Sequence, residues 1–129
     1  MLSKIMVVDD SMFMRNVVKG MIQKMGHTLI CEASDGREAV ANYKIFRPDV
    51  VTLDITMPGM DGITALKEII SFDPKAKVIL CSAIHSQSLI SQALREGACD
   101  FLDKPIQSDK LAEAIQLGSL CADTKPSKL

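Results

Sequence analysis

Short apolar runs alternate along this chain with longer segments in which apolar residues recur every three or four positions. A continuous apolar run predicts a buried strand, whereas the three-to-four spacing predicts an amphipathic helix. The apolar runs that we interpret as strands are 4–8, 28–33, 49–53, 77–81 and 99–102. A helical pattern follows each of them, and this alternation is typical of an α/β fold with a parallel sheet.

Residues that cap or end helices mark the boundaries of the helical segments. Serine and aspartate favour helix starts because their side chains accept hydrogen bonds from the free backbone N–H groups there. The predicted starts are Ser11, Asp35, Asp61 and either Ser86 or Ser88. Gly26 and Gly97 are placed to end the first and fourth helices. The fifth helix follows Lys104-Pro105.

The predicted strands are mainly apolar runs rather than alternating patterns, which indicates a sheet that is buried on both faces. Right-handed crossover connections leave few ways to arrange five strand–helix units. We therefore expect a doubly wound, five-stranded parallel sheet with five helices, formed by residues 1–121. The segment 122–129 lacks periodicity, and we expect it to be a flexible C-terminal tail.

Composition excludes several classes of protein. The net charge of −1 argues against a strongly basic surface for nucleic acid. No apolar stretch is long enough to cross a membrane, and the N-terminus lacks the pattern of a signal peptide. We therefore expect a cytoplasmic protein. The cysteines are widely spaced and form no metal-binding motif, so we expect reduced thiols that pack as small apolar side chains.

Polar side chains stand where four of the predicted strands end. Asp9 and Asp10 follow the first strand, Asp54 follows the third, Ser82 the fourth and Lys104 the fifth. In open α/β sheets ligands bind at the carboxyl ends of the strands, so we expect these residues to converge. The sequence therefore predicts a pocket that contains three carboxylates, a hydroxyl and an ammonium group.

The three carboxylates indicate a bound cation. Two like charges about 4 Å apart cost roughly 4 kcal/mol at an effective dielectric near 20. Oxygen ligands without histidine or cysteine favour Mg²⁺, with Mn²⁺ as a substitute, over zinc. Asp54 is also placed to attack phosphorus and form an acyl phosphate. Taken singly, these residues are better explained in other ways: Asp9 and Asp10 as helix caps, Ser82 as a turn or cap residue and Lys104 as a surface charge. Their joint placement at four strand ends favours the pocket.

The segments that carry these residues resemble a known family, the receiver domains of bacterial two-component response regulators. They are VVDDS at 7–11, VVTLDITMPGMDG at 50–62, ILCSA at 79–83 and GACDFLDKP at 97–105. They match in order and approximate spacing, and the resemblance covers essentially residues 2–120. The resemblance implies a flavodoxin-like sheet with strand order 2-1-3-4-5. It also implies a stand-alone, CheY-like regulator of the chemotaxis type.

The resemblance implies a role for each acidic residue. Asp54 would be the phosphoacceptor. Asp10, Asp54 and the backbone carbonyl of Thr56 would bind Mg²⁺ directly, whereas Asp9 would act mainly through water.

The resemblance further implies how phosphorylation changes the shape of the protein. Lys104, joined to Pro105 by a cis peptide bond, would pair with the phosphoryl group, and Ser82 would swing toward one of its oxygens. Phe101 occupies the position of the second switch residue, which is often tyrosine or threonine in the family, and it offers no hydroxyl. The fourth helix, fifth strand and fifth helix would form the changed surface.

The expected partners also follow from the resemblance. A CheA-like histidine kinase would supply the phosphoryl group to a monomeric protein, which would then bind a flagellar motor switch protein; a phosphatase is a further expected partner. The alternative is a phosphorelay intermediate that passes the group to a histidine phosphotransfer protein. In either role the chain would be a phosphoacceptor regulator that catalyses its own phosphorylation, rather than an enzyme with a separate substrate.

Two other classes of protein share parts of the pattern. A phosphatase of the haloacid dehalogenase type needs a second aspartate two residues after the nucleophile, and the chain has Thr56 there. A flavodoxin-type module needs a hydroxyl- or glycine-rich phosphate loop after the first strand. Asp9 and Asp10 would instead repel a phosphate at that position.

Overall fold

The predicted alternation of strands and helices is present in the computed structural model, which describes residues 2–124 and the side chains of residues 2–117. In chain order the elements are β1 (Lys4–Val8), α1 (Met12–Lys24), β2 (Thr28–Ala33), α2 (Gly36–Phe46), β3 (Val50–Asp54), α3 (Gly62–Phe72), β4 (Val78–Ser82), α4 (Gln87–Arg95), β5 (Asp100–Asp103) and α5 (Ser108–Thr124). The α/β class is therefore confirmed, with five strands and five helices in the described part of the chain.

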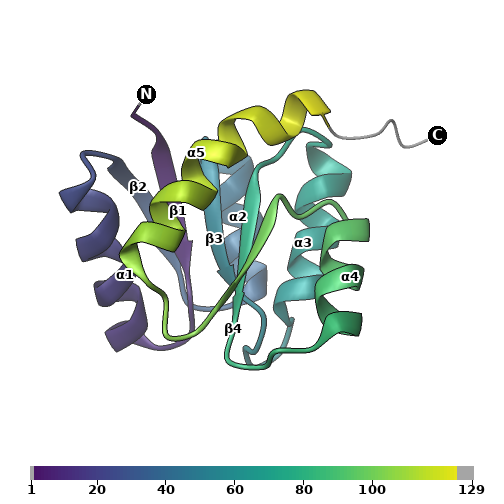
Figure 1. The fold of residues 1–129 in the computed structure, drawn as a ribbon. Helices are drawn as coiled ribbons and strands as arrows, with labels where there is room; N and C mark the ends of the chain where they lie inside the picture. Colours follow the sequence, from purple (N-terminus) through teal and green to yellow (C-terminus); the bar gives the residue numbers. More distant parts are fainter. Residues whose placement is uncertain (1, 125–129) are drawn as a thin grey trace.

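The strands form one parallel sheet in the order β2-β1-β3-β4-β5. This order is the one that the family resemblance implies. Helices α1 and α5 cover one face of the sheet, and α2, α3 and α4 cover the other (Figure 1). The arrangement is doubly wound, and it brings the ends of β1, β3, β4 and β5 to the same edge.

Two apolar clusters fill the space between the sheet and its helices, one on each face. Strand β1 shows why its sequence is apolar from Ile5 to Val8. Ile5 and Val7 pack against α1 and α5, and Met6 and Val8 pack on the opposite side. All four side chains are at most 2% exposed. Successive residues of a strand point to opposite faces, so a strand covered on both sides buries every one of these side chains and favours apolar residues at consecutive positions.

Three strands begin and end one residue later than the sequence predicts. Strands β3, β4 and β5 continue to Asp54, Ser82 and Asp103. Asp54 pairs with Cys81 across the sheet, and Ser82 pairs with Asp103. The difference arises because backbone N–H and C=O groups continue the ladder whatever the polarity of the side chain. Two of the polar site residues are therefore held inside the sheet.

The predicted helix caps are confirmed. In each of four helices the cap side chain accepts a hydrogen bond from the backbone N–H three residues later; these caps are Ser11, Asp35, Asp61 and Ser86. Gly26 and Gly97 follow α1 and α4 with φ angles of 90° and 108°. Helix α5 continues to Thr124, three residues into the segment 122–129 that we expected to be a tail, and residues 125–129 lie outside the described part.

The prediction of reduced cysteines is wrong for one residue. Cys31 and Cys81 are free thiols, but Cys99 is disulfide-bonded. Spacing along the chain does not reveal which thiols the fold brings together, so the bond could not be predicted from the sequence. As for membrane segments, none of the described helices is long and apolar enough to cross a bilayer.

Candidate functional site

Residues from four strand ends meet at one edge of the sheet, as the sequence predicts. They are Asp9, Asp10, Asp54, Ser82 and Lys104. Asp9 and Asp54 are each 4% exposed and Ser82 is 1% exposed, whereas Asp10 is exposed. These side chains therefore form a cluster whose members are mostly buried and which is open to solvent at Asp10.

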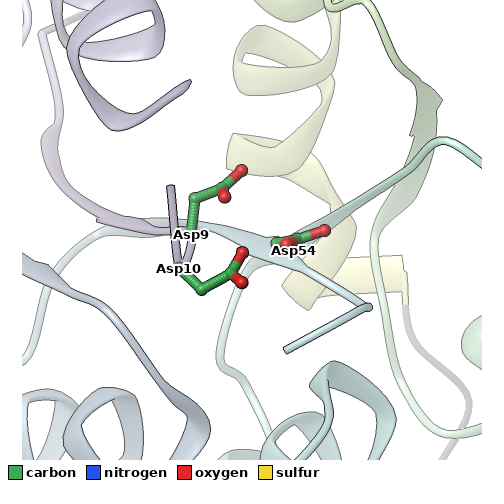
Figure 2. Close-up of side chains that lie close together, drawn as sticks. All are labelled: Asp9, Asp10 and Asp54. Carbon is green, nitrogen blue, oxygen red and sulfur yellow. The ribbon is translucent and has the colours of Figure 1, made fainter. Parts of the chain in front are cut away.

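Three carboxylates form the centre of the site. Asp9, Asp10 and Asp54 each offer an oxygen atom, and these oxygens all lie within 4.8 Å of one another. Figure 2 shows the side chains of Asp9 and Asp10 extending from the end of β1 toward the side of the sheet on which Asp54 lies. Such crowding of like charges is unfavourable without a cation. The oxygen-only donor set, one exposed carboxylate and the remaining negative charge fit a hard divalent ion such as Mg²⁺.

Lys104 joins two of the acidic residues. Its Nζ atom lies 2.8 Å from Oδ2 of Asp9 and 3.1 Å from Oδ1 of Asp54. Burial alone would lower the pKa of Lys104, but its hydrogen bonds to the two carboxylates and their charges raise the pKa above its usual value. The backbone N–H of Lys104 also donates to the Ser82 carbonyl at 2.8 Å, and the bond to Pro105 is cis, as the resemblance implies.

Of the three carboxylates, Asp54 is the one that lies inside a strand, at the end of β3. Burial of its carboxyl group raises its pKa, and the negative charge of Asp9 raises it further. Lys104 and a backbone hydrogen bond from Thr56 oppose this effect and do not cancel it. The carboxylate is therefore more basic than an ordinary aspartate, and a more basic oxygen is a better nucleophile once it is ionised.

The loop between β3 and α3 can lie directly against Asp54 because residue 62 is a glycine. A Cβ atom at Gly62 would lie 2.3 Å from the carbonyl oxygen of Asp54 and 2.6 Å from the Cα atom of Ile55. The N–H of Gly62 donates to the Ile55 carbonyl at 2.8 Å, which closes the loop. Thr56 lies in this loop and is exposed. The role of its carbonyl oxygen as a metal ligand stays a prediction.

The two predicted switch residues lie in different surroundings. Ser82 is buried, and its hydroxyl oxygen accepts a hydrogen bond from the backbone N–H of Ile84 at 2.9 Å. Phe101 is half-buried: it packs against the core on the side of α2, α3 and α4, and it lines a cavity of about 370 Å³ beside the start of α5. The switching roles of both residues stay predictions.

Sequence reasoning did not single out Arg15 as a residue of the site. Its guanidinium donates a hydrogen bond from Nη1 to the backbone carbonyl of Asp9 at 2.8 Å. The available signal was its place in the chain, because it is the first basic residue after the two acidic ones and lies one helical turn beyond Ser11. Glu32, which pairs with Arg15 from β2, carries no signal in the sequence because the two residues are remote in the chain.

Comparison with protein families places the chain in a specific group. The family described as "Response regulator receiver domain" matches residues 5–116. The chain is 48% identical over 112 residues to the chemotaxis protein CheY of Thermotoga maritima. The aligned residues cover 87% of this chain and 93% of that protein. It is 50% identical over 115 residues to the chemotaxis protein CheY of Bacillus subtilis, covering 89% of this chain and 96% of the relative.

Solved structures give the same result. The chain is similar to CheY in a CheX-CheY-BeF₃-Mg²⁺ complex from Borrelia burgdorferi, with a TM-score of 0.86 and 40% identity over 88% of this chain and 86% of the other. It is also similar to the response regulator domain of Thermotoga maritima CheB, with a TM-score of 0.86 and 36% identity over 98% of this chain and all of the other.

Proposed function

Because this chain belongs to the response regulator receiver domain family and is a CheY-like chemotaxis receiver, we propose that Asp54 accepts a phosphoryl group from the phosphohistidine of a histidine kinase. The protein is a phosphoacceptor regulator rather than a classical enzyme. The observation that carries the proposal is the contact of one ammonium group with both buried carboxylates, Lys104 with Asp9 and Asp54. The site thus holds a nucleophile and a cation side by side.

The transfer requires one bond to form and one to break. An oxygen of the Asp54 carboxylate attacks phosphorus, the phosphorus–nitrogen bond of the donor histidine breaks, and the nitrogen keeps the electron pair. Lys104 is placed to follow the new negative charge, because its ammonium can leave Asp54 for a phosphoryl oxygen while it keeps Asp9. The product is an acyl phosphate on Asp54.

Asp10, Asp54 and the carbonyl of Thr56 would hold the metal ion directly, and Asp9 would contact it mainly through water. When bound, Mg²⁺ supplies positive charge that stabilises the oxygens of the transferred group. The spacing of the three carboxylates supports this assignment, and so does the CheY relative that was solved with BeF₃ and Mg²⁺. Manganese would substitute because it favours the same oxygen ligands.

Phosphorylation would change the shape of the protein through Ser82. Its hydroxyl would leave the N–H of Ile84 and bond to a phosphoryl oxygen, which moves the loop between β4 and α4. Phe101 would then shift position against the core, and the surface formed by α4, β5 and α5 would change. A ligand shifts such an equilibrium only by binding one state more tightly, and the phosphoryl group would do so through the Ser82 and Lys104 contacts.

The partners belong to the same proposal. A CheA-like kinase would supply the phosphoryl group, and a flagellar motor switch protein would bind the phosphorylated form. A phosphatase of the CheX type would end the signal, because a similar CheY has been solved in complex with CheX.

Acetyl phosphate and Mg²⁺ test the chemistry directly, with intact-mass measurement as the readout. We expect a labile adduct of one phosphoryl group per chain that disappears with Asp54→Asn and with a chelator. Asp109→Asn is the matched control, because Asp109 is an exposed aspartate in the first turn of α5. An adduct that persists in Asp54→Asn would overturn the assignment of the phosphoacceptor.

A binding measurement tests the partner. A flagellar switch protein is expected to bind more tightly after phosphorylation, and Asp54→Asn should remove the increase. Equal binding before and after phosphorylation, together with transfer of the group to a histidine phosphotransfer protein, would instead support the phosphorelay alternative.

A further inference from the structure

Arg15 reaches from α1 back to the loop that carries the acidic pair. Its Nη1 atom donates a hydrogen bond of 2.8 Å to the carbonyl oxygen of Asp9. That oxygen belongs to the peptide unit between Asp9 and Asp10, so the contact fixes the plane from which both side chains extend. Figure 2 shows the two side chains leaving the end of β1 next to each other, with Asp54 beside them.

Every other polar group of Asp9 also has a partner. Its N–H donates to the Ala33 carbonyl at 3.1 Å, and its Oδ1 atom accepts a hydrogen bond from the N–H of Ser11 at 3.0 Å. Lys104 takes the second carboxylate oxygen at 2.8 Å. The remaining polar group of Asp9 is its carbonyl oxygen, which belongs to the peptide unit shared with Asp10, and Arg15 is the hydrogen-bond donor to it. Asp10 itself is exposed, and its backbone N–H belongs to this same peptide unit.

Glu32 holds the guanidinium in place from the neighbouring strand β2. Its Oε1 atom lies 3.0 Å from Nε of Arg15, and its Oε2 atom lies 2.9 Å from Nζ of Lys19. The hydrogen bond from Lys19, together with the Arg15 hydrogen bond and both positive charges, lowers the pKa of Glu32 despite partial burial. Because a guanidinium is planar, fixing Nε on Glu32 also fixes the direction of Nη1.

From these contacts we propose that Arg15 is a positioning residue for the metal site, which it serves by orienting the Asp9–Asp10 peptide while Glu32 orients Arg15. The inference rests on the proposed function, because it concerns the Mg²⁺ ion of that site. Groups that orient metal ligands without touching the metal commonly change affinity by 10- to 100-fold.

Two effects of Arg15 on the metal have opposite signs. Orientation of the ligands favours binding, whereas a positive charge near the site opposes it. Lys19 separates them, because it bonds to the same carboxylate and carries the same charge but makes no hydrogen bond to Asp9 among the described residues. Removing either cation changes the charge equally, and only removal of Arg15 frees the peptide.

The experiment measures the affinity of the unphosphorylated protein for Mg²⁺ by titration calorimetry, with thermal denaturation to establish that each variant is folded. Arg15→Gln and Arg15→Lys are expected to weaken Mg²⁺ binding about tenfold. Lys19→Gln is expected to leave it unchanged or slightly stronger. Arg15→Lys keeps the charge and is the milder change, so it carries the test if Arg15→Gln does not fold.

The outcomes separate the inference from the proposed function. If both Arg15 variants bind Mg²⁺ as tightly as Lys19→Gln does, Arg15 only fastens α1 to β2, and the positioning role is wrong while the metal site stands. If the wild-type protein binds no Mg²⁺ but is still phosphorylated at Asp54, the assignment of the metal site is wrong, and the positioning role of Arg15 is wrong as well. The positioning role is supported if Mg²⁺ binding is weaker in both Arg15 variants and is not weaker in Lys19→Gln.

Discussion

The hydroxyl oxygen of Ser82 accepts a hydrogen bond from the backbone N–H of Ile84 at 2.9 Å. This bond joins the last residue of β4 to the loop that leads into α4. Ser82 is 1% exposed, so its hydroxyl has few alternative partners. A phosphoryl oxygen on Asp54 would accept a hydrogen bond from the Ser82 O–H, and the movement of the side chain toward it would take the hydroxyl oxygen away from the Ile84 N–H. The loop would then change its position.

The first prediction concerns Ser82→Ala. Phosphorylation by acetyl phosphate should still reach one group per chain, because the hydroxyl does not take part in forming the bond. The change at the loop should be lost: in nitrogen–proton correlation spectra, the amide signal of Ile84 should shift on phosphorylation of the wild-type protein and stay in place in the variant.

Ser82→Thr is the matched control, because it keeps the hydroxyl and should keep the shift of the Ile84 signal. If the Ile84 signal moves equally in Ser82→Ala, the loop responds to the phosphoryl group by another route and Ser82 is not the switch residue.

The second prediction concerns the close approach of Gly62 to Asp54. In Gly62→Ala the new Cβ atom would lie 2.3 Å from the Asp54 carbonyl oxygen, so the β3–α3 loop has to move. Inserting a methyl group into a tight contact costs about 1–3 kcal/mol. We expect a loss of that size in the free energy of unfolding, measured in urea, together with weaker Mg²⁺ binding.

Gly20→Ala provides the control with the opposite sign. Gly20 lies inside α1, and a Cβ atom there would meet no atom within 4 Å. Alanine is better than glycine in a helix by about 0.5–1 kcal/mol, so this variant should be more stable than the wild type. A stable Gly62→Ala with normal Mg²⁺ affinity would show that the loop tolerates displacement.

The elements of the fold could be predicted because their signals are local. Strand β1 is apolar from Ile5 to Val8, and the caps Ser11, Asp35 and Asp61 precede their helices directly. The bounds of β3, β4 and β5 were placed one residue too early because side-chain hydrophobicity was used to place them, whereas the bounds of a strand depend on backbone pairing with a neighbour. Strand order came from the family resemblance, since right-handed crossovers alone leave several orders open.

The acidic residues of the site could be predicted from topology, because the ends of parallel strands meet at one edge whatever their distance in the sequence. The contacts of single side chains could not. Arg15 reaches the Asp9 carbonyl only because α1 packs beside β2 and Glu32, and the Ser82–Ile84 bond depends on the path of one loop. The disulfide of Cys99 likewise depends on approach in space.

The third prediction is a pH dependence of stability that arises from Asp54. Burial and the charge of Asp9 raise the pKa of Asp54 in the folded protein above its ordinary value of 3.8. Above that value the folded state keeps a proton that the unfolded state has released, so the free energy of unfolding falls as pH rises through the folded pKa. The charged carboxylate therefore destabilises the metal-free fold at neutral pH.

Asp54→Asn removes this charge and should raise the urea midpoint at neutral pH in the presence of a chelator. The advantage over the wild type should disappear as pH falls below 3.8, where both folded and unfolded states hold the proton. A lower midpoint for Asp54→Asn at neutral pH would mean that the contact with Lys104 outweighs burial and the Asp9 charge.

The fourth prediction separates metal binding from catalysis at Lys104. The ammonium of Lys104 now occupies Asp9 and Asp54 at 2.8 Å and 3.1 Å, where it competes with a metal ion for their charge. In Lys104→Met we expect Mg²⁺ to bind about tenfold more tightly, because unit charges about 4 Å apart interact by roughly 1 kcal/mol even in water and the ion is divalent. Without Mg²⁺ the variant should lose about 3 kcal/mol of stability, since two buried carboxylates lose their counterion.

The rate of phosphorylation should move in the opposite direction. In the function that we propose, Lys104 neutralises charge on the transferred phosphoryl group, and loss of such a group slows a reaction by about 100-fold or more. Lys67→Met, at an exposed position on α3, should change neither quantity. Tighter Mg²⁺ binding with slower transfer is a combination that general destabilisation does not produce, because an unfolded site would lose both. A variant that binds Mg²⁺ more tightly and is phosphorylated at the wild-type rate would limit Lys104 to a structural counterion.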